Sequence, residues 1–169
     1  KSCADLIAQA YFSSYQLPVC ITRFGNLFGP GDLNFNRLIP GTIRSTIRCE
    51  APVIRSDGKF SRDYIYVEDA AIAYAMVAKK MASEPKLAGN AFNFSYEAPL
   101  DALDVVNKIL HEMGQDDLEP QILDIAKNEI PHQYLSSKKA REMLGWQPQH
   151  HFEKGLSLTI PWYENWLKE

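Results

Sequence analysis

Arginines are concentrated in one part of this chain. Six of the seven lie between residues 23 and 62, where together with Lys59 they outnumber Asp32, Glu50 and Asp57 by four, although the whole chain has a net charge of -3. A guanidinium group presents a planar set of donors that matches phosphate oxygens in pairs. The stretch therefore predicts a site for a small phosphorylated ligand. The six residues are Arg23, Arg37, Arg44, Arg48, Arg55 and Arg62.

Arg62, in the segment SRDY, is the strongest single candidate for a phosphate clamp. The alternative is a structural ion pair, for which Asp57 and Asp63 are the nearest acidic residues in the sequence. For Arg44 and Arg48 the expectation is different. They share one helical face, opposite three isoleucines, so we expect them to face solvent.

A glycine-rich segment, FGNLFGPGDLNFN, follows the β-branched run VCIT at residues 19–22. Such a run is typical of a buried parallel strand, and ligands of open α/β sheets bind beyond the carboxyl ends of these strands. Gly25, Gly29 and Gly31 could let the backbone approach a ligand closely, or could serve turn geometry alone. The sequence leaves both roles open.

The elements that position these residues are predicted from the spacing of apolar residues. Asp101 and Asp104, three residues apart, resemble a capping box at the start of one helix, and Gly114 and Gly145 are placed to end two helices. The predicted helices span 1–15, 38–48, 68–81, 101–113, 136–144 and 152–168; the predicted strands span 19–22, 63–67 and 91–95, and the glycine-rich segment is a predicted loop.

This alternation predicts the α/β class. Only about two strands of a parallel sheet can be counted, whereas a doubly wound sheet usually has more. The helical pattern also runs from residue 1, without a capping residue ahead of it. We therefore expect the chain to be part of a larger α/β fold.

Composition argues against several classes of protein. The isoelectric point is about 5.8 and basic residues do not interleave with aromatic ones, so we expect no nucleic-acid partner. No apolar run approaches the roughly 20 residues of a membrane helix, so we expect no membrane partner and a cytoplasmic location. Cys3, Cys20 and Cys49 are expected to be reduced, buried thiols. The four histidines show no metal-ligand spacing, so no metal is expected.

Four segments in order carry a family resemblance: KSCAD before an aliphatic helix, then RFGNLFGPGD, RLIPGTIRS and DGKFSRDYIYVEDAAIAY. Their order and spacing resemble the C-terminal half of the extended short-chain dehydrogenase/reductases, the superfamily of NAD-dependent sugar epimerases and dehydratases. With PVIRSDG and IPHQYLSSKKAREMLGW included, the chain is most similar to the CDP-glucose 4,6-dehydratases. The resemblance covers essentially all of the chain.

The resemblance implies a Rossmann-like fold. Residues 1–169 would form its last parallel strands and the smaller substrate-binding lobe, and the N-terminal NAD-binding half would be absent from this sequence. The fingerprint G-x-G-x-x-G, expected after the first strand of such a fold, is also absent. The implied cofactor is NAD and the implied partner is a nucleotide sugar, CDP-glucose in the most similar group. The intact protein would be a homodimer, formed through the helix that contains residues 4–15.

Lys1 would be the catalytic lysine of the family's Tyr-x-x-x-Lys pair, whose tyrosine lies ahead of this sequence. Two residues four apart share a helical face, so the ammonium can lower the pKa of the phenol and favour the phenolate as a base. The same ammonium can donate to ribose hydroxyls of the cofactor. The resemblance assigns Arg23, Phe24 and Gly25 to the neighbourhood of the nicotinamide.

Substrate-binding residues are implied in the same way. Asn26 would donate to the diphosphate, and Arg37 and Leu38 would flank the nucleotide at a helix N-terminus, which favours phosphate. Ile54 would pack against the base. The full implied set is Asn26, Arg37, Leu38, Ile54, Arg62, Asn93, His132 and Tyr134.

For the intact protein the resemblance implies a 4,6-dehydratase reaction: oxidation at C4 of the sugar with hydride transfer to NAD, elimination of water across C5 and C6, and return of the hydride to C6. The isolated chain lacks the tyrosine and the acidic group that drives elimination, so we expect it to be inactive. Two alternatives remain open. One is a 4-epimerase, or a dehydratase for another nucleotide. The other is a non-catalytic module that binds nucleotide sugars or forms an interaction lobe.

Overall fold

Two parallel strands form the sheet that the sequence predicts. In the computed structural model, which describes residues 1–126 and 128–168, β1 (Ile21–Phe24) pairs in parallel with β6 (Ala91–Phe94). Arg23 lies opposite Asn93 in this register, and Phe24 lies opposite Phe94. The β-branched run therefore leads into a parallel strand, which begins two residues later than predicted. These pairs alternate between the two faces of the sheet.

The glycine-rich segment is not a continuous loop, and this prediction was wrong. Its residues Asn26–Phe28 form β2, which pairs in parallel with β5 (Tyr64–Tyr66). The step from β1 to β2 passes through Gly25, where an added Cβ would lie 2.4 Å from the carbonyl oxygen of Asp63. The turn signals of the segment hide a strand of only three residues, whose stability comes from a partner far along the chain.

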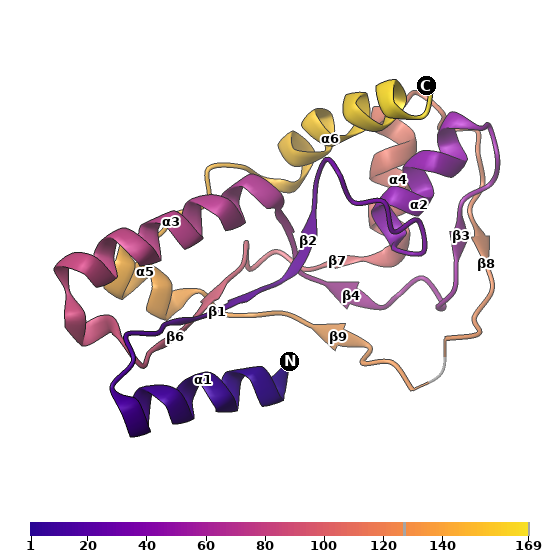
Figure 1. Ribbon diagram of the computed structural model, residues 1–169. Coiled ribbons are helices and arrows are strands. Elements are labelled where there is room, and N and C mark those ends of the chain that lie inside the picture. The colour runs from indigo at the N-terminus through magenta and orange to yellow at the C-terminus, as the bar shows by residue number, and fades with distance from the viewer. Residues whose placement is uncertain (127, 169) are drawn as a thin grey trace.

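One face of the β1–β6 pair is covered by helices α3 (Val67–Ser83) and α5 (Lys138–Leu144) (Figure 1). The short helix η1 (Pro85–Leu87) connects α3 to β6. Small residues of α3, among them Ala73, let the helix approach closely. The buried cluster here consists of Ile65, Ala73, Val77, Leu87, Phe92, Phe94, Ala140, Leu144 and Trp146. Burying such large apolar side chains is the main stabilising contribution to this half.

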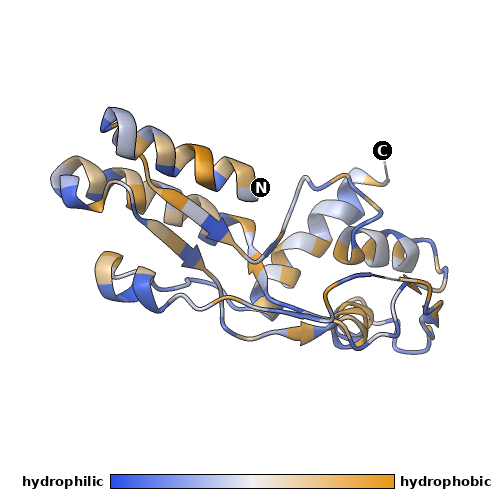
Figure 2. Ribbon diagram, turned by 90° about the horizontal axis from the view of Figure 1, so that it is seen from below, coloured by the Kyte–Doolittle hydropathy of each residue, from blue (hydrophilic) through white to orange (hydrophobic). Residues whose placement is uncertain are grey.

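Helix α1 (Ser2–Tyr15) lies on the opposite side of the pair and contributes no buried residue. Figure 2 shows apolar residues along this helix, next to the N-terminus. Side chains of Phe12 and Asp5 attach it to the neighbouring part of the chain. The Phe12 ring packs on Gly89, and the Asp5 carboxylate pairs with Arg23.

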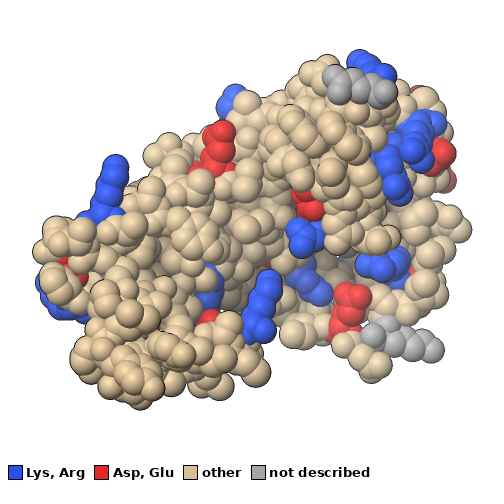
Figure 3. Space-filling view, viewed as in Figure 1, with Lys and Arg blue, Asp and Glu red and all other residues tan. Residues whose placement is uncertain are grey.

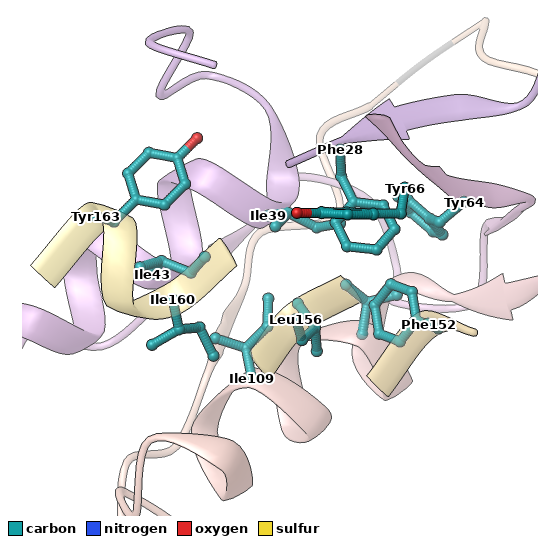
Figure 4. Packing of buried hydrophobic residues seen from close by; sticks show 11 residues of the cluster. Phe28, Ile39, Ile43, Tyr64, Tyr66, Ile109, Phe152, Leu156, Ile160 and Tyr163 are labelled. Atoms are coloured by element: carbon teal, nitrogen blue, oxygen red, sulfur yellow. The ribbon is translucent and has the colours of Figure 1, made fainter. Parts of the chain in front are cut away.

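A lobe at the other end is built from three helices, α2 (Leu38–Ile47), α4 (Ala102–Glu112) and α6 (Phe152–Trp166), which pack against one another. Figure 4 shows their apolar side chains meeting those of β2 and β5. This cluster therefore joins the lobe to the sheet. It contains Phe28, Ile39, Ile43, Tyr64, Tyr66, Val105, Ile109, Phe152, Leu156, Ile160 and Tyr163.

Short strands complete the lobe. β3 (Val53–Ile54) pairs with β8 (Gln121–Ile122), and β4 (Ser61–Arg62) lies between β7 (Leu100–Asp101) and β9 (His132–Gln133). The β4–β9 pairing is parallel and the β4–β7 pairing is antiparallel. These strands bring the segment around residue 132 next to the segment around residue 62.

The predicted helices are confirmed, with ends that differ by a few residues. Gly114 and Gly145 adopt φ angles of +64° and +68° beyond α4 and α5, as expected for residues that end helices. The predicted capping box was wrong. Asp101 is the N-cap of α4 but its side chain makes no capping hydrogen bond.

The prediction that the cysteines are buried was wrong. All three thiols are free, but Cys3 and Cys49 are exposed and Cys20 is partly buried. Cys3 lies on the open helix α1, and Cys49 follows the end of α2. Across the residues that the structure describes, no helix is long and apolar enough to cross a membrane.

Candidate functional site

The carboxyl ends of the parallel strands converge on Gly25 and Asn26. The backbone N–H of Asn26 donates to the carbonyl oxygen of Asp63 at 2.6 Å, which fixes the start of β2 beside the start of β5. The Asn26 side chain is exposed. Gly25 is required because of close approach to Asp63, which answers the question that the sequence left open at this position. The structure therefore presents an exposed amide at the strand ends, where open α/β sheets bind ligands.

Arg62 ends β4 and directly precedes Asp63, whose carbonyl accepts from Asn26. One of its terminal nitrogens donates to the carbonyl oxygens of Ser61 (2.8 Å) and Pro131 (3.2 Å). Its acidic partner is Glu129, at 3.7 Å, rather than Asp57 or Asp63. The side chain is 16% exposed, so backbone carbonyls hold this cation in place without a close carboxylate to neutralise it.

His132 lies on β9, and Tyr134 follows it. The Nδ1 atom of His132 is 2.9 Å from the Ser61 hydroxyl, and both His132 and Tyr134 are exposed. Strand alternation puts Ser61 and His132 on one face of the three-stranded sheet and Arg62 on the other. Tyr134 borders a hollow of about 270 Å³ that is also lined by Glu97, Pro99, Leu135 and Ser136.

Arg23 and Asn93 lie side by side on the α1 face of the sheet. The Nε atom of Arg23 donates to Asp5 of α1 at 2.6 Å, so this arginine joins the helix to the strand. Phe24 points to the opposite face. Its ring stacks on Phe94 at 5.2 Å and contacts Tyr74, so it belongs to the packed side of the sheet.

The remaining sequence-predicted residues are more dispersed. Lys1 is exposed at the start of α1. Arg37 is the N-cap of α2 and pairs with Asp32 at 3.0 Å, and Leu38 is partly buried behind it. Ile54 is 1% exposed and lies in a core cluster with α4, so its side chain offers no surface to a ligand.

Two buried carboxylates at the ends of β5 were missed by sequence reasoning. Asp63 is 2% exposed and its Oδ2 contacts the Ser95 hydroxyl. Asp69 is 1% exposed and accepts from the Tyr96 hydroxyl at 2.6 Å. The dipeptide Ser95–Tyr96 therefore binds both acids. The signal in the sequence was the pair of aspartates flanking the apolar run YIYV, because a charge beside a buried strand needs a partner.

Burial shifts the pKa values of several groups in the junction between the start of β5 and the end of β6. It raises the pKa of Asp63 and raises the pKa of Tyr64 to about 12. For Glu97 burial acts in the same direction, but hydrogen bonds from the Ser137 backbone and from Arg141 outweigh it, so the pKa of this carboxyl lies below its usual range.

Figure 3 shows Lys and Arg side chains gathered across the middle of one face, between the end that carries α1 and the end that carries α2. This is the region in which the strand ends lie in Figure 1. Asp and Glu side chains lie among them in the same view, so the basic groups there are partly neutralised.

Parallel strands covered by helices, with polar residues at their carboxyl ends, define an α/β protein of the Rossmann-like class, in which ligands bind beyond the strands. The sequence profile of the NAD dependent epimerase/dehydratase family matches residues 1–94. The chain belongs to the NAD-dependent epimerase/dehydratase family.

Similar proteins support this assignment. The trifunctional UDP-glucose 4,6-dehydratase/UDP-4-keto-6-deoxy-D-glucose 3,5-epimerase/UDP-4-keto-L-rhamnose-reductase of Arabidopsis thaliana is 31% identical over 96% of this chain and 24% of its own length. The structure of dTDP-glucose 4,6-dehydratase from Bacillus anthracis in complex with NAD is 27% identical, with a TM-score of 0.85 over 98% of this chain and 50% of that one. UDP-glucose 4-epimerase from Thermotoga maritima shares the fold, with a TM-score of 0.88 at 24% identity over 99% of this chain and 52% of that one.

The chain thus spans about half, or less, of the length of these relatives. NAD is the cofactor of the family, and relatives of known structure contain it. These relatives are named for UDP- and dTDP-sugars. These names describe the relatives, which are longer than this chain.

Proposed function

We propose that this chain is the nucleotide-sugar-binding half of an NAD-dependent nucleotide-sugar 4,6-dehydratase, with CDP-glucose as its substrate. The observation that carries the proposal is the set of groups around the Arg62 guanidinium. Backbone carbonyls orient its guanidinium, and its acidic partner lies as far as 3.7 Å away. A diphosphate can supply the close negative charge that such a cation lacks.

The neighbouring groups fit the same ligand. The exposed amide of Asn26 supplies a neutral donor at the strand ends, and Arg37 with Leu38 begins α2, whose N-terminal N–H groups favour phosphate. His132 and Tyr134 are exposed on the neighbouring segment and can approach the ribose or the sugar. We assign Ile54 a supporting role through the core, because its side chain is buried.

The residues at the end of β1 fit the nicotinamide part of NAD. Arg23 presents a hydrogen-bonding group on one face of the sheet, beside the substrate-binding candidate Asn93, and Gly25 leaves the strand end without a side chain. When bound, NAD would accept a hydride from the sugar and return it. In this chain Lys1, Arg23, Phe24 and Gly25 would hold or orient that cofactor, and Lys1 would complete a catalytic pair with a tyrosine outside the sequence.

The choice of cytidine rests on the resemblance of the segments PVIRSDG and IPHQYLSSKKAREMLGW to CDP-glucose 4,6-dehydratases. The alternatives are the nucleotides in the names of the relatives, UDP and dTDP. A dehydratase rather than an epimerase is favoured because relatives at 27% and 31% identity are dehydratases by name. We further propose that the intact protein is a dimer.

Calorimetric titration of the chain with CDP, UDP, dTDP and CDP-glucose tests this proposal. We expect the cytidine nucleotides to bind most tightly. Arg62→Ala should weaken binding by about 10- to 100-fold, because a hydrogen bond to a charged group contributes about 1.5–3 kcal/mol.

The matched control is Arg48→Ala, which removes the same charge from an exposed position at the end of α2. It should change affinity by less than about twofold, since distant exposed charges are screened. Tighter binding of UDP or dTDP would overturn the cytidine assignment and retain the site. Equal losses from both variants, or no nucleotide binding by a chain that circular dichroism shows to be folded, would contradict the proposed site.

A further inference from the structure

Asp63 has an unusual environment for an acidic residue. Its side chain is 2% exposed, and within the described part of the chain no group donates to its Oδ1 atom. The adjacent cation, Arg62, is directed toward Ser61, Pro131 and Glu129 instead. An ionised carboxylate with one buried, unpaired oxygen would carry a large desolvation cost, which a neutral carboxyl group largely avoids.

The hydrogen bonds around Ser95 point to the same protonation state. The Ser95 hydroxyl oxygen receives the N–H of Glu97 at 2.9 Å and lies 3.1 Å from the carbonyl oxygen of Leu135. A carbonyl can only accept, and the hydroxyl has one proton. When that proton goes to Leu135, the contact between Ser95 and the Oδ2 atom of Asp63 needs a proton on Asp63.

We propose that Asp63 is a positioning residue that acts as a neutral carboxylic acid, donating its proton to Ser95 so that residues 131–137 are held against the ends of β1 and β2. Its backbone carbonyl accepts from Asn26, while Ser95 bonds to Leu135 and accepts from the Ser137 hydroxyl through its own carbonyl. Asp63 thus fixes both Asn26 and the segment that contains His132 and Tyr134. Its importance for substrate binding rests on the proposed function.

The other titratable groups at this junction have partners of their own. Tyr96 donates to Asp69, Glu97 accepts from Arg141 and Ser136, and His132 contacts Ser61. Tyr64 and Arg62 adjoin Asp63 in the sequence, and burial keeps the Tyr64 phenol neutral. Burial also raises the pKa of the Asp63 carboxyl. The folded chain therefore holds this proton more tightly than the unfolded chain, and the junction weakens as pH rises through the raised pKa.

Carboxyl-carbon NMR titration of the full chain, labelled with ¹³C at aspartate, tests the protonation state without any ligand. The Asp63 signal, identified by its loss in Asp63→Asn, should titrate above the ordinary aspartate value of about 3.9. Asp117→Asn, at an exposed position, is the matched control and should leave the Asp63 signal in place. A signal from Asp63 that titrates with the exposed aspartates would overturn the proposal.

Hydrogen exchange of residues 131–137 tests positioning. Raising the pH through the Asp63 titration should increase the opening of this segment in the wild-type chain, after correction for the intrinsic pH dependence of exchange. The Asp63→Asn chain should not respond, because an amide donates to Ser95 at every pH. Ser95→Ala should open the segment about tenfold more often at low pH. An identical response of the wild-type and Asp63→Asn chains would contradict the proposal.

Nucleotide binding separates this inference from the proposed function. Protection that depends on Asp63, in a chain that binds no nucleotide, would leave the junction intact and reject the ligand. Nucleotide binding that is unchanged by pH and by Ser95→Ala would retain the ligand site and reject a positioning role for Asp63. With both proposals correct, Ser95→Ala should weaken CDP binding about tenfold at low pH, and Asp63→Asn should bind equally at both pH values.

Discussion

The two faces of the β1–β6 pair differ sharply. On one face α3 and α5 bury Phe92, Phe94 and Trp146 completely. On the other face none of the residues of α1 is itself buried, and its apolar side chains Leu6 and Ile7 are 65% and 59% exposed. Helices α1 and α3 both have apolar residues at helical spacing. The spacing alone therefore does not tell whether the apolar face of a helix is covered within the same chain.

The difference also separates two kinds of attachment. The α3 face is held by close-packed side chains, in which the loss of a methylene group is felt. The α1 face is held by a ring on a glycine and by one ion pair, Asp5 with Arg23. Arg23, which we propose for cofactor binding, and Asn93, which we propose for substrate binding, both lie on this second, weakly attached face.

The largest effect is expected on the packed face. Phe92→Ala should lower the free energy of unfolding by about 3–5 kcal/mol, because it removes a fully buried ring and leaves a cavity. Leu6→Ala on α1 should change it by no more than about 0.5 kcal/mol. Urea denaturation followed by circular dichroism measures both. A comparable loss from Leu6→Ala would mean that α1 is covered in solution and would break the contrast.

An intermediate effect is expected where α1 meets η1. Gly89 has a φ angle of +79°, and an added Cβ would lie 2.2 Å from the Phe12 ring. Gly89→Ala should cost about 2–3 kcal/mol, since overpacking adds to the cost of a left-handed conformation. Gly114→Ala, at φ +64° with open space around it, carries only the backbone cost of about 1 kcal/mol.

Thermal unfolding of these two variants isolates the contact. Removing the ring by Phe12→Ala in the Gly89→Ala background should recover part of the extra destabilisation of Gly89→Ala over Gly114→Ala, because the collision with the ring is removed. Equal destabilisation by the two glycine substitutions would show that Phe12 does not rest on Gly89, and this contact would then not attach α1.

The smallest effect is expected from the ion pair. Arg23 and Asp5 are 43% and 28% exposed, so their interaction should contribute about 0.2–1 kcal/mol. A double-mutant cycle with Arg23→Gln and Asp5→Asn should give this coupling, and it should fall as salt is added. A larger coupling that salt leaves unchanged would place the pair in a more buried setting than this face provides.

Much of the fold could be predicted because long periodic segments have few alternatives. The helices and the main strands followed from apolar spacing and glycine stops such as Gly145. Strand β2 was missed because its three residues sit among turn signals and gain order from β5, far away in sequence. The capping box at Asp101 failed because sequence spacing does not fix where the side chain points.

The candidate site was less accessible to sequence reasoning. Arg62 was identified by type, but its carbonyl acceptor on Pro131 depends on pairing between β4 and β9. Ile54 fits an apolar role equally well in a core or against a base, and only burial distinguishes the two. The partners of Asp63 come from two segments distant in sequence, so the sequence showed the acid without its environment.

The parallel pairing of β1 with β6 has a consequence for synthesis of the protein. Ile21 finds its partner Ala91 only after the residues that form α2, β5 and α3 have been made. During translation the edge of β1 that pairs with β6 must stay open until then, and contacts between distant residues slow the search for the native state. A ribosome-bound chain that ends before β6 should therefore be a better substrate for chaperones and proteases than one that extends a few residues beyond it.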